Sequence, residues 1–425
     1  MNDPTLRLRR ILLVDCDAFF VQVARLQDPE GAGRAHLLLV GGSAEGRGVV
    51  TSASYACRPF GVRSGMPMGQ ALRLCPEAVV VPVPRSACVD RSRAVRDALG
   101  DLAPVVQAAS IDEFYLDLTG MERLLQGESL GETAERIRNR VREVAEISVS
   151  IGGGTNRLVA KLAAGRAKPA GVHVVPSGEE AGFLAGFGLR EIPGVGPSLL
   201  EALERRGLQE VRDVVGVEEE WLVRWFGEAR GRWLFERCRG IDPSPVVAEE
   251  ERKSISSERT FSRDVSAGSS GDRILERHLL QLALSVGEGL RGRGLRARTV
   301  TVKLRDGDFT TRQGSRTLPH PMESDRILYE TAGELLAELR RKRRAPTRLL
   351  GVGVSNLSEE AVPRQLSLLE EEDDRTETDR DRTLSHLGDE LRARFGRKAI
   401  LPGGILAEDR EEDREEAREA GGEDD

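Results

Sequence analysis

The chain has 425 residues, of which 39% are hydrophobic and 31% are charged, and its formal net charge is −7. This length exceeds one ordinary hydrophobic core, so we expect several domains. No apolar run of about 18–20 residues is available to cross a membrane, and residues 1–10 lack the apolar segment of a secretory signal. These features exclude an integral membrane protein and favour a cytoplasmic one.

The negative charge is concentrated at the C-terminal end. Residues 370–425 hold 21 acidic and 10 basic residues, a net charge of −11, so residues 1–369 carry +4. Within residues 252–369 there are 22 basic and 14 acidic residues. A basic block of this kind is typical of a surface that binds phosphates, so the overall charge does not exclude a nucleic-acid binder.

The cysteines are scattered, without a C-x-x-C pair or a nearby set of histidines. This pattern favours buried thiols over zinc ligands or disulfides. The five are Cys16, Cys57, Cys75, Cys88 and Cys238.

Strands and helices alternate through the first 175 residues. Apolar runs predict strands at 10–14 and 35–42, and a third strand at 48–54 follows a glycine-rich turn. Helical spacing predicts helices over residues 66–76, 86–99, 132–146 and 155–167. A strand, ISVSIGGG, is predicted just before the last of these helices. The last helix ends at Lys168, because Pro169 disfavours helix in the residue before it. The alternation indicates an α/β or α+β module.

The rest of the chain divides into a helical part, a linker and a second mixed part. Residues 176–240 are typical of short helices, and residues 240–254 are rich in proline and charge, as linkers are. A small α+β domain is then predicted from helices 272–290 and 324–342 and strands 298–305 and 348–357. From residue 370 acidic residues dominate, so we expect a mostly disordered tail with a short helix within 384–400.

Three carboxylates are candidates for a shared site. Asp15 ends the first strand, and Asp112 and Glu113 lie between apolar runs about a hundred residues later. Carboxylates gathered at strand ends repel one another unless cations neutralise them, and Mg²⁺ takes oxygen ligands of this kind. Spacing alone leaves open that these are ordinary surface acids.

Cationic and hydroxyl side chains could complete such a site. Tyr55 and Arg58 are three residues apart, so they are neighbours on a helical turn and could share a polyphosphate. Arg157, Lys161 and Lys168 lie on and after the helix 155–167. Each of these residues taken singly could equally be an ordinary surface residue without a binding role.

Six segments occur in the order found in the Y-family translesion DNA polymerases, and most resemble the bacterial polymerase IV branch. They are LVDCDAFF, YACRPFGVRSGMPMGQALRLCP, SIDEFYLDLTG, GTNRLVAKLAAGRAKPAGV, IPGVGP and ERTFSRD. The resemblance covers about residues 8–369 and implies an α+β multidomain, right-hand polymerase. The implied domains are palm (7–26 and 86–175), fingers (27–85), helical thumb with a helix-hairpin-helix (176–240), linker (241–252), α+β little finger (253–358) and acidic tail (359–425).

The resemblance also implies roles for single residues. Asp15, Asp112 and Glu113 match catalytic acids that hold two Mg²⁺ ions, with the Cys16 backbone carbonyl as a further ligand, and Asp17 supports them. The expected nucleotide-binding residues are Phe19, Phe20 as the steric gate against ribose, Tyr55, Arg58 and Lys168. Phe114 replaces a usual small residue, and residues 152–154 are richer in glycine than usual. Both departures are expected near the site.

Contacts to DNA and to a sliding clamp are implied as well. Gly194 and Gly196 match the helix-hairpin-helix that approaches a DNA phosphate through backbone amides. On the strand 298–305, one face is apolar and the other carries Thr301, Lys303 and Arg305, which with RKRR at 341–344 would grip the duplex backbone. The clamp-binding peptide is expected at residues 365–369, with Gln365, Leu366, Leu368 and Leu369 in the pocket.

The sequence therefore predicts a monomeric, low-fidelity DNA polymerase that performs translesion synthesis without proofreading. Its expected partners are primer–template DNA, dNTPs and the sliding clamp. Two alternatives remain open: a non-catalytic DNA-binding accessory protein of the same fold, and another two-metal nucleotidyl transferase such as a nucleotide cyclase.

Overall fold

The computed structural model describes residues 8–125, 127–248, 251–359, 377–396 and 399–400. It divides into two compact units, residues 1–250 and 251–425. No helix within the described ranges is long and apolar enough to span a membrane. All five cysteines are free and buried, as expected from their spacing.

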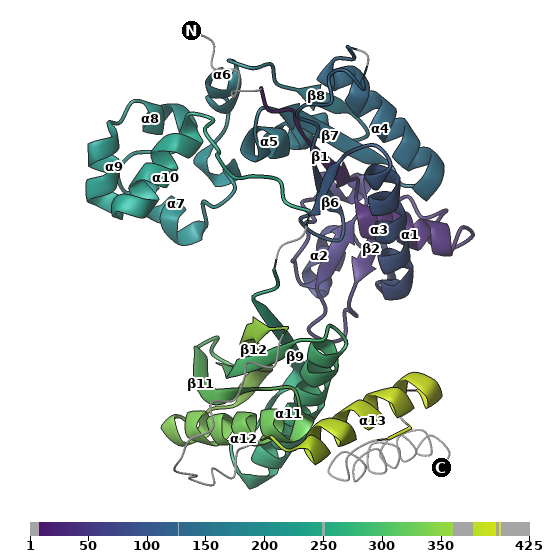
Figure 1. The fold of residues 1–425 in the computed structure, drawn as a ribbon, viewed down its shortest axis with the longest axis vertical. Coiled ribbons are helices and arrows are strands. Elements are labelled where there is room, and N and C mark those ends of the chain that lie inside the picture. The colour runs from purple at the N-terminus through teal and green to yellow at the C-terminus, as the bar shows by residue number, and fades with distance from the viewer. Residues whose placement is uncertain (1–7, 126, 249–250, 360–376, 397–398, 401–425) are drawn as a thin grey trace. The chain divides into compact units, whose positions relative to one another are not determined.

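A five-stranded sheet forms the centre of the first unit, with the strand order β5–β6–β1–β7–β8. Its strands are β1 (Ile11–Cys16), β5 (Val105–Ala108), β6 (Glu113–Asp117), β7 (Val149–Gly154) and β8 (Val172–Val174). The helices around it are α1 (Phe19–Gln27), α3 (Arg85–Gly100), α4 (Leu130–Ala145) and α5 (Arg157–Ala167) (Figure 1).

The central strands β1 and β7 are buried on both faces, which explains why β1 is an unbroken apolar run. Leu12 and Val14 point into a core shared with α3 and α4. Ile11 and Leu13 point to the other face, against Ala160 of α5. Alternation along β1 therefore decides which helix each residue meets, and it places Asp15 on the α5 face.

A smaller sheet of three strands, β3–β2–β4, belongs to the segment between α1 and α3. Its elements are β2 (Leu38–Gly41), β3 (Val50–Ala53), the 3₁₀ helix η1 (Tyr55–Phe60), α2 (Met68–Leu74) and β4 (Val79–Val81). A cluster of short helices follows the five-stranded sheet and has its own core, continuous with Leu158 and Val159 of α5. These helices are α6 (Glu180–Leu184), η2 (Leu189–Glu191), α7 (Pro197–Glu204), α8 (Val211–Val215), α9 (Glu219–Phe226) and α10 (Glu228–Cys238).

The second unit is a four-stranded antiparallel sheet, β11–β10–β12–β9, with α11 and α12 packed on one face (Figure 1). Its elements are β9 (Ser254–Val265), α11 (Ser269–Arg291), β10 (Arg296–Asp306), β11 (Thr311–Met322), α12 (Asp325–Lys342) and β12 (Thr347–Ser358). The helices and the strands β10 and β12 lie close to the predicted ranges. β9 and β11 were not predicted, because charged and polar residues interrupt their apolar alternation.

The tail differs from the prediction in one segment. Residues 379–395 form a 17-residue helix, α13 (Asp379–Phe395), which begins at a capping box made by Thr378 and Asp381. This is longer than the short helix that we expected within 384–400, and it is docked on the second unit. The physical reason is a set of ion pairs with α11 and α12 that composition alone does not reveal.

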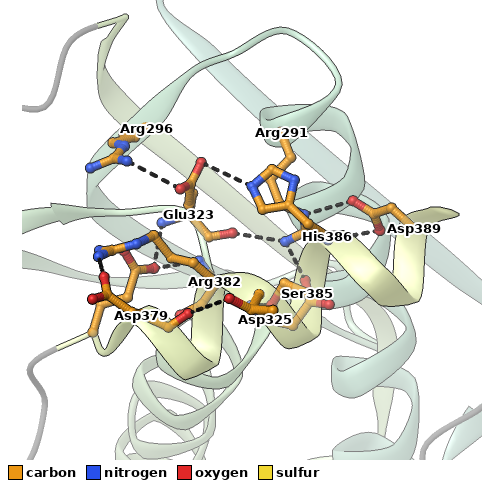
Figure 2. A network of polar contacts seen from close by, with 12 residues as sticks. Arg291, Arg296, Glu323, Asp325, Asp379, Arg382, Ser385, His386 and Asp389 are labelled. Atoms are coloured by element: carbon orange, nitrogen blue, oxygen red, sulfur yellow. Dashed lines mark hydrogen bonds and ion pairs between the residues drawn. The ribbon is translucent and has the colours of Figure 1, made fainter.

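The docking of α13 uses charged side chains rather than apolar ones (Figure 2). The side chain of Arg291, 1% exposed, donates to both oxygens of Asp389 and to Asp325. Arg326 donates to both oxygens of Asp381. Ser385 accepts a hydrogen bond from the Asp325 amide. We call this set of contacts the α13 seam.

Candidate active site

Pairing of β1 with β6 brings two of the expected acids together. Asp15 lies directly opposite Glu113 in the antiparallel register. Opposed residues on paired strands project to the same face, so both carboxylates lie on the α5 side of the sheet. Asp112 comes just before β6; its backbone carbonyl accepts a hydrogen bond from the Cys16 amide, and its carboxylate accepts one from Ser110 Oγ at 2.5 Å. The fold thus joins Asp15 with Glu113, whereas the Asp112 carboxylate is turned toward Ser110.

The glycine run of β7 lets α5 approach these acids. A Cβ at Gly152 would lie 2.0 Å from the Ala164 amide nitrogen and 2.1 Å from the Ala160 carbonyl oxygen. Any larger residue would push α5 away from the sheet, since real Cβ atoms do not approach backbone so closely. The glycine-rich departure from the family pattern therefore serves helix packing.

Two lysines reach the acids, one from α5 and one from the residue that ends it. Lys161 lies on α5, and Lys168 follows its last residue with extended backbone (φ −71°, ψ 138°). Lys161 Nζ lies 2.7 Å from both carboxylate oxygens of Glu113. Lys168 Nζ lies 2.7 Å from Asp15 Oδ1. Each acid of the cross-strand pair thus has its own ammonium group.

Burial destabilises the ionised form of Asp15, so positive charge nearby is favourable. The side chain of Asp15 is only 13% exposed. Burial raises the pKa of Asp15 to about 6 against the lowering effect of Lys168, and the negative charges of Glu113 and Asp112 raise it further. Ionised carboxylates in such a place are stabilised by any added cation.

The residues present fit a divalent cation in part. Within the described ranges, no three His, Cys, Asp or Glu side chains are grouped closely enough to hold a metal ion as they stand. Asp15 and Glu113 offer the oxygen ligands that Mg²⁺ prefers, and the lysine ammonium groups already occupy positions of positive charge beside them. The Asp112 carboxylate accepts a hydrogen bond from Ser110, and it lies close enough for its charge to raise the pKa of Asp15.

Asp17 is a buried acceptor that joins four parts of the chain. Its carboxylate accepts hydrogen bonds from the Tyr55 hydroxyl (3.0 Å) and from the Ala170 amide (2.9 Å). It also accepts from the hydroxyls of Ser148 (3.0 Å) and Ser150 (2.7 Å). These contacts fix η1 and the segment after Lys168 to the end of β1. The sequence indicated only a supporting role for Asp17.

Tyr55 and Arg58 lie together on η1, as their spacing predicted. The Arg58 guanidinium carbon lies 3.9 Å from the centre of the Tyr55 ring. Burial and the negative charge of Asp17 raise the Tyr55 pKa, so the hydroxyl stays protonated and can donate. Arg58 also lines an open cavity of about 460 Å³ with Ala53, Val62, Arg63 and Ser64.

The aromatic residues separate into core and partly exposed positions. Phe19 and Phe114 are each 1% exposed and belong to the core on the α3 and α4 face. Phe114 therefore points away from the acids, because its neighbour Glu113 takes the opposite face; our expectation that it lies near the site was wrong in this respect. Phe20 is half-buried at the start of α1 and meets the Phe19 ring edge-on at 5.5 Å.

Family models match most of the first unit and residues 252–368 of the second. The impB/mucB/samB family matches residues 14–165, its C-terminal domain matches residues 252–368, and the thumb domain of DNA polymerase iota matches residues 190–242. Similar proteins include DNA polymerase IV of Dehalococcoides mccartyi, 38% identical over 82% of this chain and 87% of that protein. DNA polymerase IV of Halorhodospira halophila is also 38% identical, over 82% of this chain and 95% of that protein.

Solved structures agree with these matches. A Y-family DNA polymerase chimera of Dbh and Dpo4 superposes with a TM-score of 0.73 and 26% identity, over 83% of this chain and all of that chain. An insertion ternary complex of Dbh DNA polymerase matches over the same shares with a TM-score of 0.58. The chain belongs to the Y-family DNA polymerases. It is a DNA-directed DNA polymerase of the polymerase IV type, with the α+β multidomain fold that the motifs implied.

The expected DNA contacts of this Y-family polymerase lie on both units. Gly194 has a positive φ of 102°, and Gly196 is the residue before the first turn of α7. On β10, Val300, Val302 and Leu304 are fully buried. The Thr301 and Ser315 hydroxyls share a hydrogen bond, and Arg305 donates one to the Thr311 hydroxyl. Lys303 forms an ion pair with Glu258 of β9 at 2.9 Å. The polar face of β10 is thus the one that α11 and α12 leave uncovered.

The basic segment 341–344 and the clamp-binding peptide were also expected to contact partners. Within 341–344, Arg343 is bound to Asp306 and Asp308, so this basic residue serves the domain's own structure. The clamp-binding peptide, with Gln365, Leu366, Leu368 and Leu369, lies outside the described residues.

Proposed function

We propose that this Y-family polymerase performs translesion synthesis of low fidelity, joining dNTPs to a primer 3′-hydroxyl with two Mg²⁺ ions and without proofreading. The observation that carries the proposal is the cross-strand pair of Asp15 and Glu113 beside Lys161 and Lys168. Asp15, Asp112, Glu113 and the Cys16 carbonyl would hold the metal ions. When bound, the ions would activate the hydroxyl and neutralise the developing phosphate charge.

The chain's own groups would position the triphosphate. Tyr55 presents a protonated hydroxyl, Arg58 presents a guanidinium suited to phosphate oxygens, and Lys168 presents a point charge. Asp17 fixes both Tyr55 and the segment after Lys168, so it is a positioning residue. Catalysis here is placement and electrostatic stabilisation, with no covalent intermediate.

Phe20 is proposed as the steric gate that excludes ribonucleotides. It lies at the start of α1, four residues beyond Cys16, and so follows closely on the end of β1, where the acids lie. Phe20→Ala should admit ribonucleotides in single-nucleotide incorporation. Unchanged discrimination between the two sugars would remove this role from Phe20.

DNA would be held without base readout. The amides around Gly194 and Gly196, and the uncovered face with Thr301, Lys303 and Arg305, suit phosphate contacts. Affinity for a primer–template should therefore fall steeply between about 50 and 200 mM salt. An affinity that ignores salt in this range contradicts the proposal.

The remaining partners are also proposals. We infer that the monomeric protein works in the cytoplasm and docks on the sliding clamp through residues 365–369. Deleting these residues should abolish stimulation by the clamp and spare basal synthesis.

The decisive experiment is primer extension with Mg²⁺ on matched templates, one undamaged and one carrying a lesion. We expect extension past the lesion and no removal of a mismatched 3′ end. A polymerase that stops before every lesion tested, or one that excises the mismatch, would overturn the finer proposal and leave the family assignment intact.

A further inference from the structure

Lys161 of α5 and Lys168, the residue after α5, contact the acids in a way that a nucleotide-binding role does not require. Lys168, expected at the triphosphate, instead contacts Asp15, and Lys161 contacts Glu113 with equal distances to both oxygens. These lysines are 28% and 36% exposed, and their acid partners are 13% and 26% exposed. Each lysine is therefore more exposed than the acid that it neutralises, and neither ion pair is sealed from solvent.

We propose that Lys168 and Lys161 are resident counter-cations of Asp15 and Glu113, which together with Asp112 we call the palm acids, and that a divalent cation displaces Lys168 from Asp15 and frees it for the triphosphate. Metal and nucleotide would then bind cooperatively through this one side chain. The inference rests on the proposed function of Asp15 and Lys168, and it adds an order of events that the proposed function does not contain.

The chemistry of lysine favours displacement. Its ammonium is a strongly hydrated point charge on a flexible stem, and Lys168 makes a single contact with Asp15. A divalent ion carries twice the charge and prefers the same oxygens. After release of its side chain, the backbone of Lys168 would stay near the site, because the Ala170 amide, two residues later, is bound to Asp17.

The two lysines should differ in their response. Lys168 has a second task, because it is expected to bind the triphosphate after release. Lys161 contacts both oxygens of Glu113 in the middle of α5, and no nucleotide contact is proposed for it. Removing either lysine therefore relieves competition with the metal, but only removal of Lys168 should weaken nucleotide binding.

Reciprocity fixes the sign of the coupling: if a metal ion frees Lys168 for nucleotide, nucleotide must strengthen metal binding by the same factor. Coupling of this kind is typically about 5- to 150-fold in affinity. Replacing Lys168 should therefore tighten binding of the metal alone, weaken binding of nucleotide, and remove the mutual enhancement.

The test is Mn²⁺ binding to the full-length protein without DNA, followed by electron paramagnetic resonance, with and without dATP. Lys168→Met should bind Mn²⁺ alone about 5–10 times more tightly than the parent chain, bind dATP more weakly, and lose the enhancement of one by the other. Lys161→Met should bind Mn²⁺ more tightly and keep its dATP affinity. Lys168→Arg should retain dATP binding.

Controls separate this inference from the function on which it rests. Arg91→Met removes a cation that pairs with Glu146 elsewhere in the same unit and should leave Mn²⁺ binding unchanged. If Asp15→Asn binds Mn²⁺ as well as the parent, the proposed metal site itself is wrong. If Asp15→Asn loses Mn²⁺ while Lys168→Met binds it no more tightly than the parent, the displacement alone is refuted. A misfolded variant would lose both ligands together.

Discussion

The palm acids and the α13 seam use the same ingredients, carboxylates facing cations, with opposite results. Burial raises the pKa of Asp15 to about 6 although Lys168 lies 2.7 Å away. Burial also acts on Asp389, but the hydrogen bonds and charges of Arg291 and Arg392 outweigh it and lower the pKa of Asp389. The positive charge around Asp15 is thus too small to offset its burial, whereas the positive charge around Asp389 is sufficient.

Depth of burial and geometry together account for the difference, since the Asp15 side chain is 13% exposed and the Asp389 side chain 21%. Arg291 meets Asp389 with two parallel hydrogen bonds, at 2.6 and 2.9 Å (Figure 2). Asp325 receives only one bond from the same guanidinium, and burial keeps its pKa raised, as it does for Asp15. A single contact does not repay desolvation, whereas a forked pair does. Asp15 is therefore left short of positive charge, as the proposed metal site requires, and the contacts of the α13 seam are structural.

The largest effect is expected from removing palm carboxylates. Asp112→Ala/Glu113→Ala should lower the rate constant for nucleotide incorporation by at least about 10³-fold, because the charges that we propose to hold the metal are lost. Single-turnover primer extension at saturating DNA measures it. The matched control, Asp381→Ala/Asp389→Ala, removes two carboxylates from the α13 seam and should keep the parent rate. Equal losses in both variants would erase the distinction between the two regions.

The next effect concerns the fastening itself. Arg291→Met leaves Asp389 and Asp325 without their buried partner and should lower the free energy of unfolding of residues 251–396 by about 3–5 kcal/mol. Urea unfolding with hydrogen exchange of α11, α12 and α13 assigns the loss to this unit. Arg293→Met, an exposed change two residues away, serves as the control. Unaltered exchange in α13 would mean that the seam does not hold the helix.

A smaller effect should appear in the pH dependence of the first unit. The pKa of Asp15 is raised when folded, so the folded chain binds its proton more tightly, and the associated stability is present below about pH 4 and lost as the pH rises through 6. Asp15→Asn should therefore be more stable than the parent at pH 7.5, by roughly 1–3 kcal/mol. Urea unfolding between pH 4 and 8 with a chelator checks this. The proposal fails if the difference in free energy of unfolding between Asp15→Asn and the parent is the same at every pH from 4 to 8.

The smallest effect is expected at the edge of the α13 seam, with the opposite sign. The hydrogen bonds from Arg326 lower the pKa of Asp381, so its contribution is present above about pH 4 and lost as the pH falls further. Asp381→Asn should loosen α13 by about 1 kcal/mol at neutral pH and reduce its sensitivity to acid. Hydrogen exchange of residues 377–395 reports the change. A variant more easily released by acid than the parent would contradict this sign.

Much of the polymerase was predictable from local sequence. Order and spacing of the motifs identified the family, and alternation along β10 correctly separated buried Val300, Val302 and Leu304 from the polar face. Alternation along β1 and β6 likewise fixes Asp15 and Glu113 on one face once the two strands are known to pair. These properties depend on neighbours in the chain, and the sequence contains them.

Tertiary structure alone decided the partners of the charged groups. Asp17 meets the Ala170 amide across 153 residues, and Arg291 meets Asp389 across 98 residues. Phe114 turned into the core because Glu113 took the α5 face, and α13 joined the second unit because its acids found buried guanidinium groups. No local pattern encodes such contacts, since the energy of an ion pair depends on burial and distance, and both arise only when distant segments pack.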